Sequence, residues 1–159
     1  MCPSYQQFPY GRSNGLAVSI AMPLLPSLAH WLCGTVIPHK PKGFTFNPRT
    51  WLEPTFGPDI YLVSLNGRGE RFDTLPDEPA VLNWLERVAR RLSEPWVFIG
   101  GWARAGFYYL DLSVPILSRH AAEQMAFTTG ETAIFDVASG ESIDVDRAKW
   151  CERLLRRDW

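Results

Sequence analysis

Cysteine and net charge are both scarce in this sequence of 159 residues. Its cysteines, Cys2, Cys33 and Cys151, lie far apart and are odd in number, which excludes a disulfide framework and a paired Cys-x-x-Cys zinc site. The 16 Lys and Arg residues are balanced by 17 Asp and Glu residues, for a formal net charge of -1. This balance argues against nucleic-acid binding by the whole surface, although it is compatible with a local basic patch. We expect a cytoplasmic protein.

Motifs of common catalytic sites are also missing from the sequence. There is no GxSxG, P-loop, HExxH or dinucleotide GxGxxG pattern. His30, Cys33 and His39 lie within ten residues of one another, but their spacing is not a standard zinc pattern. His120 and Glu123 could transfer a proton, yet no positioned nucleophile accompanies them, which favours a solvated helix face. The sequence therefore favours a protein without enzymatic activity, cofactor or metal.

Charge is nearly absent from the N-terminal part of the chain. Arg12 is the single charged residue among the first 39, and nine of the 13 prolines precede residue 60. The chain as a whole has 46% hydrophobic and 13% aromatic residues, which excludes disorder throughout. We divide it into a proline-rich, nearly uncharged segment, residues 1–42, and a globular domain, residues 43–159.

The uncharged run Leu16–Ile37 leaves several alternatives open. Its 22 residues are long enough to cross a bilayer, but Pro23 and Pro26 weaken that interpretation. A secretory signal would have a small-x-small cleavage site at Ser27–Ala29, after a poor positive region. A third alternative is a start at Met22, with residues 1–21 as an upstream translation or a tail, and a fourth is a segment that packs against the domain. We favour the tail over packing, and packing over membrane or export.

Turn residues between short apolar runs predict three β-hairpins. A four-residue loop in the second hairpin would place Ile99 opposite Leu110. A three-residue loop in the third would place Phe135 opposite Ile143 and leave Ile134 on the other face. The three hairpins join residues 60–65 to 70–73 through Asn66-Gly67, residues 96–102 to 107–112 through 103–106, and residues 132–137 to 141–145 through 138–140.

Capping residues and apolar periodicity predict three helices. Asp77 can cap a helix that runs to about Ser93. Ser118 can cap a second helix that ends at Gly130, and Asp146 can start a third. Together these elements indicate an α+β fold with a largely antiparallel sheet and three helices on one side.

Two arginine clusters with the same spacing are candidate anion-binding sites. Three guanidinium groups within two turns of a helix could hold phosphates bidentately. Neighbouring acidic residues such as Glu86, Glu94 and Glu152 dilute this field. The clusters are Arg87, Arg90 and Arg91 in the first helix and Arg153, Arg156 and Arg157 in the last.

The second hairpin has apolar residues on both faces, so it is either central or bound to something. Trp, Tyr and Arg dominate binding hot spots because they bury large rigid surfaces. Three aromatic residues and one arginine cluster around the loop of this hairpin: Trp102, Arg104, Phe107 and Tyr109. They are candidate partner-binding residues, although a helix or the N-terminal segment could instead cover the aromatic face.

A series of short motifs between about residues 43 and 145 resembles small uncharacterised phage and prophage proteins of bacteria. In these, a Gly-Gly-Trp hairpin leads into a Tyr-Leu-Asp-x-Ser strand, a helix and an Ala-Ile-Phe-Asp hairpin. The resemblance brings no activity with it. The motifs here are Gly43–Thr50, Tyr61–Ser64, Gly100–Trp102, Tyr109–Ser113, Ala133–Asp136 and Gly140-Glu141.

The sequence leads to one principal functional hypothesis and two alternatives. The first is a small non-enzymatic interaction protein, derived from a phage or mobile element, that binds a protein partner through the aromatic face of the second hairpin. The alternative is a nucleic-acid-associated protein that uses the two arginine clusters. An enzyme with His120 or Asp111 as proton carrier has the least support. The identity of the partner and the oligomeric state are not encoded in any motif.

Overall fold

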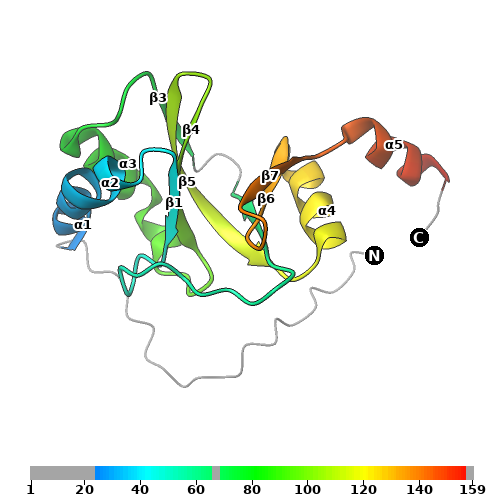
Figure 1. Ribbon diagram of the computed structural model, residues 1–159, viewed down its shortest axis with the longest axis horizontal. Helices are drawn as coiled ribbons and strands as arrows, with labels where there is room; N and C mark the ends of the chain where they lie inside the picture. The colour runs from blue at the N-terminus through cyan, green and yellow to red at the C-terminus, as the bar shows by residue number, and fades with distance from the viewer. Residues whose placement is uncertain (1–23, 66–68, 157–159) are drawn as a thin grey trace.

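A curled antiparallel sheet forms the centre of the molecule, and helices pack on its convex side (Figure 1). The computed structural model describes residues 24–65 and 69–156. The strands follow the spatial order β1-β4-β5-β2-β6-β7, and β3 also pairs with β5. The strands are β1 (Gly43–Phe46), β2 (Tyr61–Ser64), β3 (Glu70–Phe72), β4 (Phe98–Arg104), β5 (Phe107–Ile116), β6 (Ala133–Asp136) and β7 (Glu141–Asp144). The predicted α+β fold with an antiparallel sheet is therefore confirmed.

The first predicted hairpin is wrong. β2 and β3 do not pair with each other but run in the same direction along one edge of β5, each antiparallel to it. The Leu65 N–H still bonds to the Leu112 carbonyl at 2.7 Å, after which the chain leaves the edge and returns at Glu70. Because β5 is ten residues long, it offers room for two short strands in succession. The Asn66-Gly67 turn itself lies outside the described residues.

The second predicted hairpin, β4 and β5, is present with a tighter turn than expected. Arg104 pairs with Phe107, so the loop is Ala105 and Gly106 alone, both with positive φ. Such a two-residue turn matches the natural twist of the two strands. The register is shifted by two residues from the predicted one. Because side chains alternate with a period of two, the predicted faces stay the same.

The third predicted hairpin, β6 and β7, is present with its register shifted by one residue. Ile134 pairs with Ile143, and Phe135 pairs with Ser142. A shift of one residue exchanges the two faces of a strand. As a result Ile134 is 2% exposed, whereas Phe135 is 37% exposed on the concave side, the reverse of the sequence-based expectation.

The three predicted helices are present with the predicted caps. The Asp77 carboxylate accepts from the Ala80 N–H, and the Ser118 hydroxyl accepts from the Ala121 N–H. Gly130 ends the second of these helices with φ of 84°. They are α3 (Glu78–Leu92), α4 (Arg119–Thr129) and α5 (Arg147–Arg156).

A further helical segment precedes the sheet. It consists of α1 (Leu25–Trp31), a π-helical turn η2 (Leu32–Val36) and α2 (Ile37–His39). Its apolar side chains are buried in the same core as those of α3. The described part of the uncharged run therefore packs against the domain, one of the four alternatives above. No helix within residues 24–65 and 69–156 is long and apolar enough to cross a membrane.

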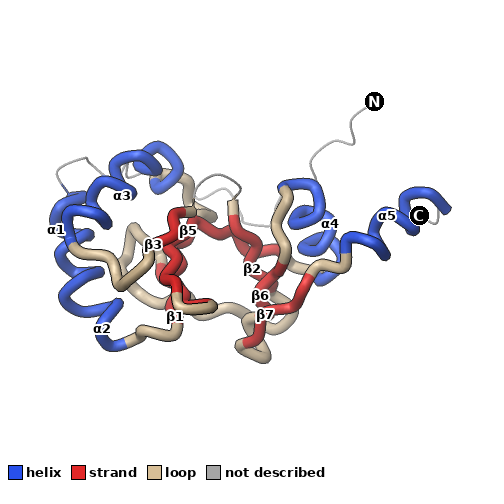
Figure 2. Tube along the Cα trace, turned by 90° about the horizontal axis from the view of Figure 1, so that it is seen from above, coloured by secondary structure: helices blue, strands red, loops and turns tan. Residues whose placement is uncertain are grey.

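Two apolar cores lie on the convex side of the sheet. One joins α1, η2 and α3 to β1, β4 and β5, and the other joins α4 and α5 to β2 and β6. Seen from above, the strands trace a curve with these helices outside it (Figure 2). The concave face is thereby left without a helix over it in the part of the chain that the structure describes.

Candidate functional site

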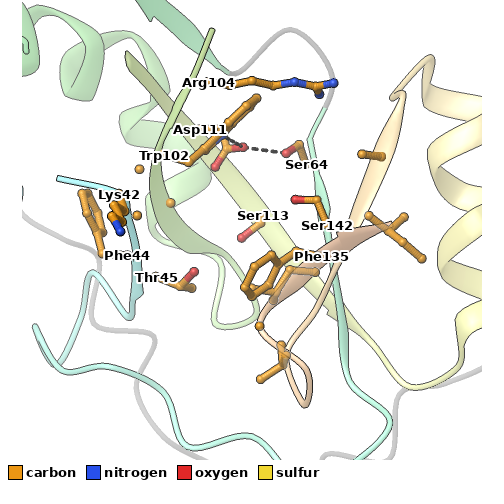
Figure 3. Close-up of a pocket in the computed structure, with 18 of the residues that line it drawn as sticks. Lys42, Phe44, Thr45, Ser64, Trp102, Arg104, Asp111, Ser113, Phe135 and Ser142 are labelled. Atoms are coloured by element: carbon orange, nitrogen blue, oxygen red, sulfur yellow. Dashed lines mark hydrogen bonds between the residues drawn. The ribbon is translucent and has the colours of Figure 1, made fainter. Parts of the chain in front are cut away.

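The concave face of the sheet holds an open cavity of about 760 Å³. Most of the strands contribute to its walls, and the segment between β1 and β2 lines it with Glu53, Pro54 and Phe56. A cavity of this size has room for several side chains of a bound molecule. We call it the groove. Its central lining residues are Ser64, Trp102, Asp111, Ser113 and Phe135 (Figure 3), and Gly100 also belongs to its lining.

Asp111 lies at the floor of the groove between two hydrogen-bond donors (Figure 3). The Ser64 hydroxyl donates to its Oδ2 at 2.6 Å, and the Trp102 indole Nε1 donates to the same oxygen at 3.2 Å. Burial raises the pKa of Asp111, and these two hydrogen bonds oppose that shift. The carboxylate is thus fixed by three strands, β2, β4 and β5.

The two glycines before Trp102 leave space for side chains on the two faces of β4. A Cβ atom at Gly100 would lie 2.4 Å from Asp111 Oδ1. On the opposite face, a Cβ atom at Gly101 would lie 2.3 Å from the ring of Phe44. One glycine therefore admits the groove carboxylate, and the other admits a core aromatic ring.

The four predicted partner-binding residues share the concave face of the β4 and β5 hairpin. The rings of Trp102 and Tyr109 stack with centroids 4.2 Å apart and an angle of 12° between their planes. Trp102 and the exposed Arg104 line the groove. Phe107 and Tyr109 continue the same face toward the hairpin turn.

Arg71 extends this aromatic face and was missed by sequence reasoning. Its guanidinium lies 4.5 Å from the centroid of the Phe107 ring. It reaches that position because β3 pairs with β5, which places Arg71 opposite Tyr109. Since the sequence pattern assigned β3 to a different partner strand, it gave no signal for this contact.

Acidic side chains predominate among the charged residues of the groove. Its lining includes four carboxylates and two cationic side chains. Glu53 is neutralised by an ion pair with Lys40. Burial, followed by the negative charge of Asp111, raises the pKa of Glu131, whereas Arg147 opposes the shift. The carboxylates are Glu53, Asp111, Glu131 and Asp144, and the cations are Lys42 and Arg104.

Hydroxyl groups line the groove, and no histidine or cysteine among residues 24–65 and 69–156 belongs to its lining. His120 lies elsewhere, against the Trp150 ring with centroids 5.1 Å apart. Glu123 accepts a hydrogen bond from Arg119 at 2.8 Å, so the sequence pair His120 and Glu123 is not brought together as an acid–base unit. The described lining of the groove therefore offers carboxylate and hydroxyl groups as its reactive polar groups.

The three residues considered as metal ligands have other partners. His30 Nδ1 lies 2.9 Å from a Glu78 oxygen, and His39 Nδ1 lies 2.6 Å from the Thr35 carbonyl. The Cys33 thiol is directed at the Pro76 carbonyl oxygen at 3.8 Å. Among residues 24–65 and 69–156, no group of three or more potential ligands is placed to hold a metal ion.

The helices α3 and α5, which carry described arginines of the two clusters, lie at opposite ends of the molecule (Figure 1). In α3, Arg87 pairs with Glu70 and Arg91 pairs with Glu94, while Arg90 is exposed. Arg153 and Arg156 belong to α5, and Arg157 lies outside the described residues.

Comparison of the chain with protein-family models, curated proteins and solved structures found no match. The resemblance to phage and prophage proteins stays a prediction. Its two central motifs, Gly100–Trp102 and Tyr109–Ser113, are cross-strand neighbours on β4 and β5, where Gly100 pairs with Asp111 and Trp102 with Tyr109.

Proposed function

We propose that this chain is a non-enzymatic interaction protein, cytoplasmic and derived from a phage or mobile element, that binds a protein partner in the groove. One observation carries the proposal: an aromatic and acidic cavity lies on the face of the sheet that the described helices leave uncovered. Binding sites are typically concave, mainly apolar and equipped with a few placed polar groups.

The residue types around the groove support recognition of a protein. Trp102 and Tyr109 form a stacked pair, and Arg104 is exposed beside them. Aromatic residues and arginine are enriched where protein interfaces have their largest energetic contributions. Because these side chains project from paired strands, they are held in position before a partner arrives and lose little freedom on binding.

Nucleic acid fits the groove less well than protein does. Phosphates would meet the carboxylates of Asp111, Glu131 and Asp144. The α3 arginines that could attract phosphates are largely used in ion pairs, since Arg87 and Arg91 each contact a glutamate. The separation of α3 from α5 also prevents the two clusters from forming one basic surface.

Affinity capture with matched variants tests the proposal. Tagged full-length protein is incubated with lysate of the source organism, and bound proteins are identified and quantified by mass spectrometry. Arg104→Glu reverses an exposed charge at the groove, and Trp102→Ala removes the largest aromatic ring there. We expect both variants to lose the partner that the wild type captures at stoichiometric amounts.

The control is the double variant Leu75→Ala and Arg90→Ala, which removes exposed side chains outside the groove. It should capture the partner normally. Circular dichroism melting must show that Arg104→Glu keeps the wild-type melting temperature. Equal capture of the partner by the wild type and both groove variants would contradict the proposal. Nucleic acid that co-purifies with the wild type and is lost only from the double variant at Leu75 and Arg90 would also contradict it.

A further inference from the structure

We propose that the partner inserts a cationic side chain, arginine or lysine, into the groove and places it against Asp111. The inference rests on the proposed function and specifies the chemistry of the partner. Three observations support it: the balance of charge in the groove, the surroundings of the Asp111 carboxylate, and the apolar walls above it.

The balance of charge favours a cation. Asp111, Glu131 and Asp144 line the groove, and none of them forms a salt bridge with another described residue. Of the two cationic residues of the lining, Lys42 directly precedes β1 and Arg104 ends β4, whereas Glu131 and Asp144 belong to the side formed by β6 and β7. A positive group that enters from the β6 and β7 side therefore meets complementary charge.

The Asp111 carboxylate has an acceptor oxygen available for such a group. Both donors, Ser64 and Trp102, bond to Oδ2, and Oδ1 accepts no hydrogen bond from the described residues. Oδ1 lies over Gly100, whose missing side chain leaves it space. A guanidinium or ammonium group would supply donors to Oδ1 and stabilise the ionised form that burial disfavours.

The walls of the groove suit the aliphatic part of such a side chain. Phe135 is 37% exposed and Leu62 lies opposite it on β2. Arginine and lysine bury their methylene groups along apolar surface while the charged end seeks a polar partner. Phe135 and Trp102 belong to opposite sides of the groove with Asp111 at its floor (Figure 3).

A titration with matched small probes tests the inference. The probes are N-acetyl-arginine amide and its neutral isostere N-acetyl-citrulline amide. The indole N–H resonance of Trp102 reports on the site in ¹⁵N-labelled full-length protein, because that group donates to Asp111. Comparison with the spectrum of Trp102→Phe assigns this resonance among those of the seven tryptophans.

We expect the arginine probe to move the Trp102 resonance saturably at millimolar concentration and the citrulline probe to leave it in place. In Asp111→Asn the amide oxygen can still accept from Ser64 and Trp102, but the charge is gone, and affinity for the arginine probe should fall at least about tenfold. Absence of a saturable shift up to 100 mM, or equal shifts with both probes, would overturn the inference.

Capture of the partner separates this inference from the proposed function. If Asp111→Asn and Glu131→Gln each lose the partner together with Trp102→Ala, both ideas are supported. If only Trp102→Ala loses it, the groove binds a protein without a cation at Asp111, and this inference alone fails. Glu152→Gln, an exposed acid on α5, serves as the charge-matched control.

Discussion

Substitution of Gly100 by alanine tests the close approach between β4 and the groove carboxylate. The new Cβ atom would lie 2.4 Å from Asp111 Oδ1, a distance that two nonbonded atoms do not tolerate. The carboxylate cannot move away freely, because Ser64 and Trp102 hold its other oxygen. The substitution must therefore displace Asp111 or separate the two strands.

The magnitude follows from two opposing contributions. Insertion of a methyl group into a filled space costs about 1–3 kcal/mol. Replacement of glycine by alanine within a strand stabilises it by roughly 0.5–1 kcal/mol where the space is free. We expect Gly100→Ala to lower the free energy of unfolding of the wild type by about 1–2 kcal/mol. In the Asp111→Ala background, where the carboxylate is absent, the same change should be neutral or stabilising.

Urea denaturation, followed by tryptophan fluorescence, measures the four members of this double-mutant cycle. The coupling free energy between positions 100 and 111 should be about 2 kcal/mol. Gly57→Ala is the matched control, because a Cβ atom at Gly57 would meet nothing within 4 Å. An equal cost of Gly100→Ala in both backgrounds would refute the reasoning about Asp111.

Three further predictions concern the groove carboxylate, the register of β6 and the cysteines. Burial raises the pKa of Asp111 in the folded protein above its ordinary value of 3.8. The stability that protonated Asp111 contributes to the wild type is therefore lost as the pH rises from the ordinary pKa through the raised pKa. The stability difference between Asp111→Asn and the wild type should grow over that range in urea titrations and then level, and a constant difference from pH 4 to 8 would contradict this. Ile134→Ala should lower the free energy of unfolding by about 2–4 kcal/mol, because Ile134 is buried, and Phe135→Ala should lower it by less than about 1 kcal/mol. Urea denaturation measures both values. A larger loss for Phe135→Ala than for Ile134→Ala would favour the register predicted from sequence. Burial, followed by the charges of nearby carboxylates, raises the pKa of Cys33 to about 11. Iodoacetamide at pH 8 should therefore label Cys33 at least about tenfold more slowly than the exposed Cys151. Equal labelling rates of the two cysteines, measured by peptide mass spectrometry, would be inconsistent with this burial.

Local signals in the sequence predicted the elements whose ends depend on a few neighbouring residues. Asp77 and Ser118 each satisfy a free backbone N–H three residues ahead, which is the chemistry that a capping pattern encodes. Gly130 adopts the left-handed conformation that glycine tolerates at a helix end. Alternation along β4 and β5 likewise placed Trp102 and Tyr109 on one face, even though their register was shifted.

Features set by distant parts of the chain could not be predicted in this way. The Asn66-Gly67 pair indicated a chain reversal, but the pairing of β2 and β3 is decided by β5, which lies more than 30 residues downstream. The one-residue shift in the β6 register depends on which side chain fits the core beneath the strand, and that side chain is Ile134 and not Phe135. Turn statistics do not contain that information.

The groove depends on such long-range contacts most of all. Ser64 and Asp111 are 47 residues apart in sequence, and only the adjacent placement of β2 and β5 joins them. Sequence reasoning identified Trp102 and Arg104 from residue type and position in a hairpin. It did not identify Ser64 or Glu131, whose roles follow from the curl of the sheet and from burial beside Asp111.

Site-specific photo-crosslinking in cells of the source organism tests most directly whether the groove holds another protein. Phe135 is replaced by p-benzoylphenylalanine, an aromatic residue that keeps a ring on the groove wall, and Leu75, exposed outside the groove, is replaced in a control. The account predicts a discrete adduct of higher mass after irradiation at position 135, absent at position 75 and lost when Arg104→Glu is added. Identical patterns at both positions, or no adduct at position 135 in cells that contain the folded protein, would contradict it.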